Sequence, residues 1–524
     1  MTTHVTDADL SAALDRIRPH VVDAHLRFLS HPLMEGRGPG TRGGDTAQEY
    51  IRAQFRRLGL QPVDGTYTQP VPLVGMNPTP TLSFRLPDGT TRELAYKDDF
   101  VLKAGMPQPE TAARAELVFV GYGITAPEYE WDDYADADVR GKVVLVRVND
   151  PGTAETPGFF GGEALTYYGR WTYKTEEASR RGAAGVLLIH TDESAGYGWN
   201  VVRTSNSGEQ YDLLGAPEFP LQVKGWVSTP AIREVLDAAG VELDELLRAS
   251  DRKDFRAVPT GVQVDAAVRS TVREVGTANV IGLLPGSDPA RAAEPVILAA
   301  HYDHLGTGVA ADGSPAIYHG AYDNASGVAV LLALAEAAAS LPTPPARPLL
   351  FVSTTAEEAG LLGSEWYARH PLFPLPRTAA MINVDGANLF GRTTDIGPLG
   401  ADRSSLGAVV TEAAAAEGMR VTPEAHPAQG MFFRQDHFPL ARAGVPALAM
   451  DHGLTYEGRP EGWGQERYIE FTTTHYHQPS DAYRDDFDYS GALQQARVTL
   501  RTALAVADAD ALPDWNPGSE FKRG

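Results

Sequence analysis

Histidine and carboxylate side chains follow the apolar segments in the C-terminal half of this sequence. Each lies where an apolar stretch ends or where a polar loop enters an Ala-rich stretch: His301, Asp303, Asp323, Glu357, Glu358 and Asp385. A further segment, THYHQPSDAY (474–483), supplies His477. Imidazole and carboxylate groups are nitrogen and oxygen ligands that suit zinc. The chemistry that these residue types favour is therefore metal binding.

The number of these acids matters more than any one of them. A single Asp after a strand usually marks the point where the chain reaches water. A buried edge that gathers this many carboxylates is self-repelling unless a counter-charge is present. After Lys224 the chain has only Lys253 and Lys522, so that charge must come from arginine or from a metal ion.

The elements that position these side chains alternate between strand and helix from about residue 275. Strands are predicted at NVIGLLPG, PVILAAHYD, 347–356, 379–385 and 445–451, and helices at 327–341, 361–370 and 404–418. Strands that are apolar throughout indicate a sheet covered by helices on both faces. Ligands of such sheets bind outside the carboxyl ends of the strands, so the acids and histidines are expected at one rim.

The rest of the chain has a different texture. Helices are predicted over 8–30 and 44–59, and Pro-rich β-structure over 66–110. The block 115–268 contains strands at 115–125, 141–148 and 184–190 and a helix at 174–182, and reads as a small α/β module of its own. The Gly-rich loop 453–470 is either a substrate lid or an ordinary surface excursion.

Composition excludes several functions. The 524 residues carry a formal charge of −23, which disfavours nucleic-acid and membrane-surface partners. There is no cysteine, so any zinc must be held by histidine and carboxylate, and a thiol nucleophile is impossible. The N-terminus has no signal-peptide pattern, and no run reaches about 18 apolar residues. The sequence as given predicts a cytoplasmic protein, with a secreted or periplasmic one as the alternative if the N-terminus has been processed.

Five segments in order, HYDHLG, GAYDNASG, TTAEEAGLLGS, NVDG and YHQPSD, resemble the dizinc aminopeptidase and glutamate carboxypeptidase II metallopeptidase family. The resemblance implies an α/β fold of the zinc-exopeptidase (phosphorylase/hydrolase-like) type: a central mixed, mostly parallel sheet flanked by helices. It also implies an inserted smaller α/β protease-associated domain. The expected divisions are 1–110 (N-terminal part of the peptidase domain), 111–270 (inserted domain) and 271–524 (catalytic domain).

Carried over residue by residue, the resemblance implies two divalent metal ions, most simply Zn²⁺. His301 and Asp385 would hold one ion, Glu358 and His477 the other, and Asp323 would bridge them. Glu357 would be the general base. Asp303 would hold the His301 imidazole in its tautomer, and Tyr476 would donate on the oxyanion side. The neighbouring histidines are expected to be packing or surface residues: His304, His319, His437, His452 and His475.

The function implied is a zinc-dependent aminopeptidase that acts on peptides. A carboxypeptidase or dipeptidase of the same fold is the first alternative, and sequence does not place the arginines that would grip a substrate carboxylate. A glutaminyl-cyclase-like use of one zinc fits less well with two complete half-sites. A non-catalytic binding protein on this scaffold remains a third possibility, although such proteins lose ligands that this chain keeps. The sequence does not indicate an oligomeric state.

Overall fold

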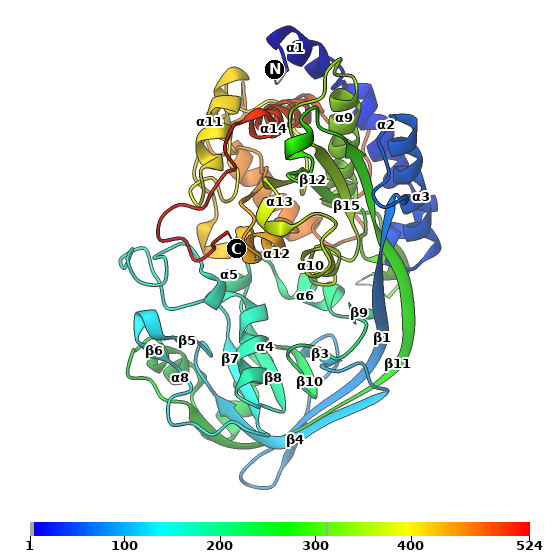
Figure 1. Cartoon of the computed structure of the whole chain (residues 1–524). Coiled ribbons are helices and arrows are strands. Elements are labelled where there is room, and N and C mark those ends of the chain that lie inside the picture. The colour runs from blue at the N-terminus through cyan, green and yellow to red at the C-terminus, as the bar shows by residue number, and fades with distance from the viewer. Residues whose placement is uncertain (1–4, 311–312, 524) are drawn as a thin grey trace. The chain divides into compact units, whose positions relative to one another are not determined.

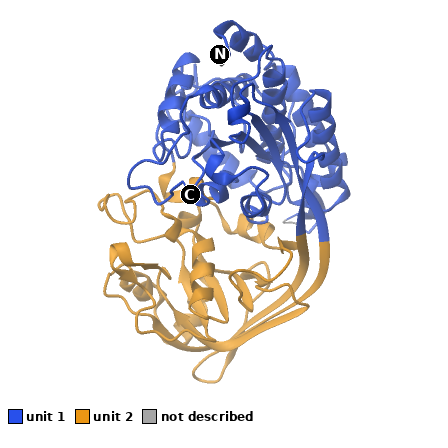
Figure 2. Ribbon diagram, in the orientation of Figure 1, with its two compact units in different colours: residues 1–72, 275–425, 434–524 blue, residues 73–274, 426–433 orange. Residues whose placement is uncertain are grey.

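Residues 5–310 and 313–523 are described by the computed structural model, which divides into two units (Figure 2). Unit 1 comprises residues 1–72, 275–425 and 434–524, and unit 2 comprises residues 73–274 and 426–433. Two long strands, β1 (Thr68–Arg85) and β11 (Val258–Leu284), belong partly to each unit.

Unit 1 is built on a mixed, mostly parallel sheet (Figure 1). Its strand order is β19 (Ala447–Ala449), β16 (Ala380–Asn383), β12 (Val296–His301), β15 (Leu349–Thr354) and the C-terminal part of β11. β19, β16, β12 and β15 are parallel, and β11 is antiparallel to β15. The predicted fold class is therefore confirmed, and β12 lies between the two strands whose ends lead to Glu357 and Asp385.

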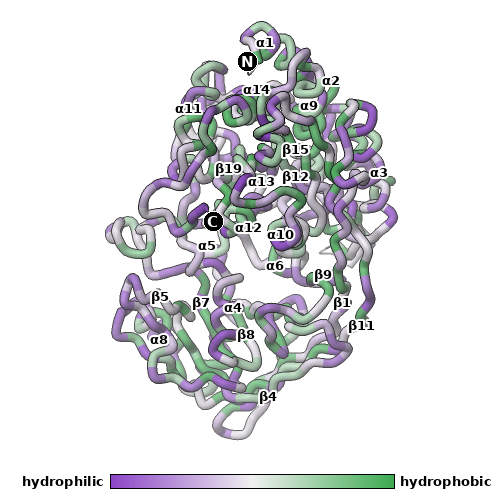
Figure 3. The backbone as a smooth tube through the Cα atoms, in the orientation of Figure 1, coloured by the Kyte–Doolittle hydropathy of each residue, from purple (hydrophilic) through white to green (hydrophobic). Residues whose placement is uncertain are grey.

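The core of unit 1 follows from the side-chain alternation of its strands. Every residue of β12 and β15 is buried. Val296, Leu298 and Ala300 belong to one apolar cluster with α9 (Gly327–Ala339) and α14 (Ser490–Asp508), while the intervening residues face the other way. Figure 3 shows the tube around β12 and β15 coloured mainly as hydrophobic. Such strands can be stable only when both faces are covered, as the apolar runs predict.

The remaining elements of unit 1 surround this sheet. The helices are α1 (Asp7–Leu14), α2 (Pro19–Leu29), α3 (Arg42–Arg57), α10 (Leu362–Arg369), α11 (Leu406–Ala416), α12 (His437–Arg442) and α13 (Trp463–Thr474). Two short pairs of strands are β13 (Gly306–Val309) with β14 (Pro315–Tyr318) and β17 (Asp395–Ile396) with β18 (Arg420–Val421). Helix α13 begins within the loop predicted over 453–470, and the lid function of that loop stays a prediction.

The first helix predicted, over 8–30, is broken in two by proline. α1 ends at Leu14, and α2 begins at Pro19, with Arg18 extended at its N-cap. Proline has no N–H to donate and favours the first position of a helix, and it disfavours the helical conformation in the residue before it. The apolar spacing continues across the break, which is why periodicity alone predicted one helix.

His25, on α2, predicts a pH dependence of stability. Burial, with a smaller contribution from Arg57, lowers its pKa from 6.5 to about 4, and its Nδ1 lies 2.8 Å from the Tyr50 hydroxyl. Between pH 6.5 and about pH 4, His25 is protonated in the unfolded chain but stays neutral in the folded chain. The free energy of unfolding is therefore greatest above pH 6.5 and decreases as the pH falls toward 4. The cost is roughly 3 kcal/mol.

The measurement is the free energy of unfolding in denaturant at pH 7 and at pH 4.5. His25→Gln removes the titrating ring, so its loss of stability between these pH values should be smaller than that of the wild type. Equal losses in the two proteins would mean that His25 does not titrate in this way.

The strands of unit 2 also pair in a mixed arrangement. The strand order is the N-terminal part of β11, then β4 (Glu110–Phe119), β7 (Val143–Arg147), β8 (Gly185–His190), β10 (Val223–Ser228) and β3 (Phe100–Ala104). β4, β7, β8 and β10 are parallel, and both edge strands pair antiparallel with them. Its helices are α4 (Trp171–Arg180), α5 (Asp192–Ala195), α6 (Trp199–Ser205), α7 (Thr229–Ala238) and α8 (Leu243–Ala249). Its shorter strands are β2 (Thr91–Glu93), β5 (Thr125–Ala126), β6 (Trp131–Asp132) and β9 (Gln210–Leu213).

The boundaries of unit 2 differ from those expected for the inserted domain. The unit begins at residue 73 rather than 111, because residues 73–104 pair within it: β1 pairs with β9, and β3 with β10. It ends at 274, close to the expected 270, and adds the short segment 426–433. That this unit is a protease-associated domain stays a prediction.

No helix within residues 5–310 and 313–523 combines the length and the apolar character needed to cross a bilayer.

Candidate metal centre

Three parallel strands of unit 1 bring predicted ligands to one edge of the sheet. β12 ends at His301, β15 is followed by Glu357 and Glu358, and β16 is followed by Asp385. Because β12 pairs in parallel with both β15 and β16, their carboxyl ends lie at the same edge. The side chains meet there: His301 Nε2 is 3.3 Å from Asp385 Oδ1 and 3.9 Å from Glu357 Oε2.

Asp323 lies between two histidines. It belongs to the segment Ala321–Ser326 that leads into α9, and His477 follows α13. Asp323 Oδ1 is 3.3 Å from His301 Nε2, and Asp323 Oδ2 is 3.2 Å from His477 Nε2. Each oxygen of one carboxylate therefore faces a different imidazole. The second imidazole also lies 2.9 Å from Glu358 Oε2.

These separations fit a pair of four-coordinate metal ions. Tetrahedral ligand atoms around an ion at 2.0–2.1 Å are separated by about 3.3–3.4 Å. The four distances in which His301 or His477 faces Asp323, Asp385 or Glu358 are 2.9–3.3 Å. Among the described residues two groups of potential ligand atoms lie together, His301–Asp323–Asp385 and His304–Asp323–Glu358, so the second group contains a histidine outside the predicted ligand set. The donor set is nitrogen and oxygen, as zinc requires in a chain without cysteine.

The charges of the site favour a cation. Burial lowers the pKa of His301, but Glu357, Asp385 and Asp323 outweigh burial and raise it well above the usual value. Burial also lowers the pKa of His477, but Glu358 and Asp323 outweigh burial and raise it to about 10. Burial opposes ionisation of Glu358, yet the nearby histidines bring its pKa down to about 2. Glu358 therefore favours a positive neighbour, whereas burial, opposed by His301, raises the pKa of Asp385.

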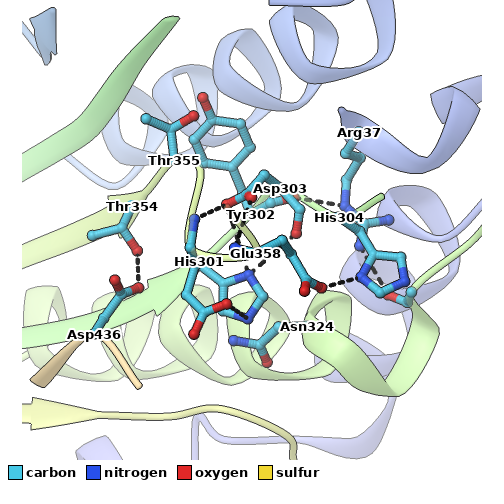
Figure 4. A network of polar contacts seen from close by, with 12 residues as sticks. Arg37, His301, Tyr302, Asp303, His304, Asn324, Thr354, Thr355, Glu358 and Asp436 are labelled. Atoms are coloured by element: carbon cyan, nitrogen blue, oxygen red, sulfur yellow. Dashed lines mark hydrogen bonds and ion pairs between the residues drawn. The ribbon is translucent and has the colours of Figure 1, made fainter. Parts of the chain in front are cut away.

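Asp303 positions two neighbouring residues of the site. Its carboxylate accepts the backbone N–H group of Glu357, at 3.1 Å, and that of the labelled Glu358, at 3.4 Å (Figure 4). We expected this carboxylate to hold the His301 ring. His301 Nδ1 lies 3.2 Å from the backbone carbonyl of Asp303 and 3.8 Å from its carboxylate, and that function stays a prediction. Asp303 thus acts mainly on the turn that presents Glu357.

Tyr476 packs against a predicted ligand. Its ring and the His477 imidazole have centroids 3.9 Å apart. The backbone N–H of Tyr476 donates to Phe471 O, at the C-terminal end of α13. This contact helps to orient His477, whereas an oxyanion-side function for the Tyr476 hydroxyl stays a prediction.

His304 lies against the predicted ligand Glu358, although the sequence indicated only a packing or surface residue. Its side chain is fully buried, and its Nδ1 lies 2.5 Å from Glu358 Oε1. The signal was present in the segment HYDHLG, where His304 stands three residues after His301 in a loop that leaves the same strand.

Asn324 and Asp481 fix the loop that carries Asp323. Asn324 Oδ1 accepts the N–H groups of Gly327 and Gly386, and its Nδ2 donates to Val384 O, so it ties this loop to the one that carries Asp385. Asp481 accepts the N–H groups of Tyr322 at 2.9 Å and Asp323 at 3.1 Å. Sequence analysis did not identify either residue.

Arg37 anchors the same loop from its other side. It is fully buried at the end of the turn Pro32–Arg37, and donates to the carbonyl groups of Leu29, Tyr302, His319 and Gly320 at 2.6–2.8 Å. Two of these carbonyls precede Asp323, and one follows His301. A planar guanidinium suits this task because its five N–H groups spread in a fixed fork.

Arg37→Lys is expected to destabilise the protein by about 1–3 kcal/mol, because an ammonium cannot reach every carbonyl and some stay buried without a donor. It should also weaken metal binding by roughly 10-fold, since the freed loops carry ligands. Denaturant unfolding and cobalt titration measure the two effects.

Arg347→Lys is the matched control for Arg37→Lys. Arg347 is a second buried arginine that donates to backbone carbonyls, those of Val506, Ala509 and Asp510. It should lose stability but keep the metal affinity of the wild type. Unchanged affinity in Arg37→Lys would contradict the prediction.

The fold and the site together indicate an α/β protein with a candidate two-metal centre at the carboxyl ends of its parallel strands. Residues 279–503 match the model for peptidase family M28. This part of the chain is a peptidase family M28 domain, and the metallopeptidase family predicted from the five segments is confirmed.

Known proteins resemble the chain in sequence over part of its length. Aminopeptidase NAALADL1 from Mus musculus is 33% identical over 132 residues, which cover 24% of this chain and 16% of that protein. A vacuolar membrane protease from Tuber melanosporum is 32% identical over 131 residues, which cover 24% of this chain and 12% of that protein. The matched segment thus spans a sixth or less of these two relatives.

Two solved structures resemble the whole chain in fold. An aminopeptidase from Aneurinibacillus sp. strain AM-1 has a TM-score of 0.54 at 20% identity, and the alignment covers 98% of both chains. A peptidase M28 precursor from Shewanella amazonensis SB2B has a TM-score of 0.50 at 19% identity, with 98% of this chain and 99% of that chain covered. At these identities the likeness establishes the fold.

Proposed function

We propose that the protein is a zinc-dependent exopeptidase that removes N-terminal residues from peptides. The observation that carries this proposal is Asp323, whose two carboxylate oxygens lie 3.3 and 3.2 Å from two different imidazoles, with Glu357 beside them. A pair of cations would be bridged by such a carboxylate, and the peptidase family M28 domain makes peptide-bond hydrolysis the reaction to test.

The ligands divide into two half-sites that share Asp323. His301 and Asp385 would hold one ion, and Glu358 and His477 the other. When bound, two such ions polarise the scissile carbonyl and lower the pKa of a water molecule between them. Three protein ligands at each ion leave a position open, which is typical of catalytic rather than structural zinc sites.

Glu357 is the general base of this mechanism. Its carboxylate lies beside the ligands, yet its nearest histidine nitrogen is 3.9 Å away, farther than in the four histidine–carboxylate pairs of 2.9–3.3 Å. It takes the proton from the attacking water and then returns it to the leaving amine. Burial, opposed by His301, raises the pKa of Glu357 well above its usual value.

Asp303 and Tyr476 support the reaction in different ways. Asp303 holds the backbone of Glu357 and so fixes the direction from which the base approaches. The Tyr476 hydroxyl is assigned as a donor to the oxygen that becomes negative when water adds to the carbonyl. That assignment rests on the position of Tyr476 next to His477.

The experiment is hydrolysis of an aminoacyl-chromophore panel and of peptides with free or blocked amino groups, each with and without a chelator. The proposal predicts hydrolysis of free-amine substrates alone, loss of activity with the chelator and recovery on adding zinc. Cleavage of N-blocked peptides at the C-terminus would indicate a carboxypeptidase instead. A zinc-loaded protein that cleaves no member of the panel would point to a binding protein.

A further inference from the structure

His304 occupies a place at the centre that the predicted ligand set does not assign. Its Nδ1 faces Glu358 (Figure 4), and each oxygen of Glu358 has a histidine partner. Oε1 of Glu358 lies 2.5 Å from His304 Nδ1, and Oε2 lies 2.9 Å from His477 Nε2.

We propose that His304 is a positioning residue that donates a hydrogen bond from Nδ1 to Glu358 Oε1 and leaves only Oε2 of that carboxylate for a metal ion. This inference rests on the metal centre of the proposed function. It makes Glu358 a one-oxygen ligand and keeps His304 out of the ligand set.

The distance separates a hydrogen bond from a shared metal ion. Two ligand atoms 2.5 Å apart would subtend an angle of only about 75° at an ion bound at 2.0–2.1 Å, far from tetrahedral. On the same basis the 2.9 Å pair of His477 and Glu358 corresponds to about 90°, and the 3.3 Å pairs around His301 correspond to about 107°. A separation of 2.5 Å is instead at the short end for a charge-assisted hydrogen bond. His304 therefore contacts the carboxylate directly.

The hydrogen-bonding capacity of the ring points the same way. An ionised carboxylate only accepts, so the nitrogen facing Glu358 must carry the proton. The other nitrogen, Nε2, is buried without a hydrogen-bond partner in the described part of the chain. The tautomer with its proton on Nδ1 is thus the one that leaves no N–H group buried and unpaired.

The His304 ring packs closely against the backbone of Gly320. A Cβ atom at Gly320 would lie 2.5 Å from His304 Cγ, so the ring fits only because that residue is glycine. The φ of Gly320 is +55°, and its carbonyl accepts from Arg37. The backbone on one side of the ring is therefore fixed by a buried cation, while Glu358 lies on the other. The hydrogen bond from His304 restricts the rotation of the Glu358 carboxylate before a metal ion binds.

The test compares His304→Leu with His304→Asn. Leucine removes the donor, whereas the asparagine Nδ2 can donate from nearly the position of the imidazole Nδ1. Zinc titration by calorimetry should show one of the two binding steps weakened 10–100-fold in the leucine variant and within a few-fold of wild type in the asparagine variant. The absorption of the Co²⁺-loaded protein should change in the leucine variant alone, and kcat should fall more than KM changes.

His25→Leu is the matched control. His25 is also buried in unit 1, and its Nδ1 also contacts a side-chain oxygen, the hydroxyl of Tyr50. It should lose stability and keep both metal-binding steps. If His304→Leu does not fold, His304→Gln replaces it, because a glutamine amide extends toward the Nε2 position and cannot restore the bond.

Two results would overturn the inference. Wild-type affinity for both ions in the leucine variant would show that the hydrogen bond does not position Glu358. Equal losses in the asparagine and leucine variants would show that His304 binds a metal directly. Failure of the proposed function looks different: the wild type would bind two ions, respond to His304→Leu as described, and yet hydrolyse no free-amine peptide.

Discussion

Glu357→Gln is expected to lower kcat by about 10²–10⁴ and to leave the metal content unchanged. Glutamine has nearly the shape of glutamate but cannot accept a proton from water. The nearest histidine nitrogen lies 3.9 Å from Glu357 Oε2, and the predicted ligands satisfy both half-sites without it. The backbone hydrogen bond from Glu357 to Asp303 is also untouched by the change.

Single-turnover hydrolysis of a free-amine substrate and elemental analysis of the same samples measure this effect. Glu365→Gln is the matched control, because Glu365 is a glutamate on α10 that pairs with Arg369 and Arg442 and takes no part in the centre. It should keep its kcat. A fully active Glu357→Gln would refute the mechanism, and loss of one ion from that variant would make Glu357 a ligand.

The part of the fold that sequence predicted correctly is the part governed by local pattern. The strands β12, β15 and β16 are apolar throughout because both faces of the sheet are covered, and that leaves a clear signal in the residues. The start of unit 2 at residue 73 has no such local signal, because β1 and β3 pair with strands that come more than 100 residues later. Local composition grouped residues 66–110 with the preceding helices, whereas long-range strand pairing places most of them in unit 2.

The site divides in the same way. Residues at strand ends were predicted because parallel strands must bring their carboxyl ends to one edge, and His301 and Asp385 do lie 3.3 Å apart. The supporting groups were missed because each acts through hydrogen bonds to distant backbone. Arg37 reaches Gly320, and Asp481 reaches Asp323, and neither contact has a spacing that a pattern could reveal. His304 had a signal in its spacing from His301, but a histidine near a motif is usually a packing residue.

Asp323 should be the most sensitive ligand, because its two oxygens face both half-sites. Asp323→Ala removes a donor from each ion at once, so we expect both to be lost, with a fall in affinity beyond the 10–100-fold typical of groups that only support a ligand. Asp323→Asn keeps one oxygen but replaces the other with an amide that repels a cation. It should therefore retain one ion, and hydrolysis should fall at least about 100-fold because a two-metal clamp no longer forms.

Asp385→Asn is compared with the Asp323 variants because Asp385 is predicted to bind one ion, whereas Asp323 is predicted to bridge both. Asp385 lies 3.3 Å from His301 and belongs to that half-site alone in the predicted set, so this variant should weaken one binding step and spare the other. Asp395→Asn is the control, since Asp395 is a buried acid that accepts from Thr455. Stoichiometry by elemental analysis after dialysis against trace zinc, with calorimetric titration, distinguishes these cases. Two ions bound in Asp323→Ala would mean that the carboxylate does not bridge, and the two half-sites would then have to be assigned separate ligands.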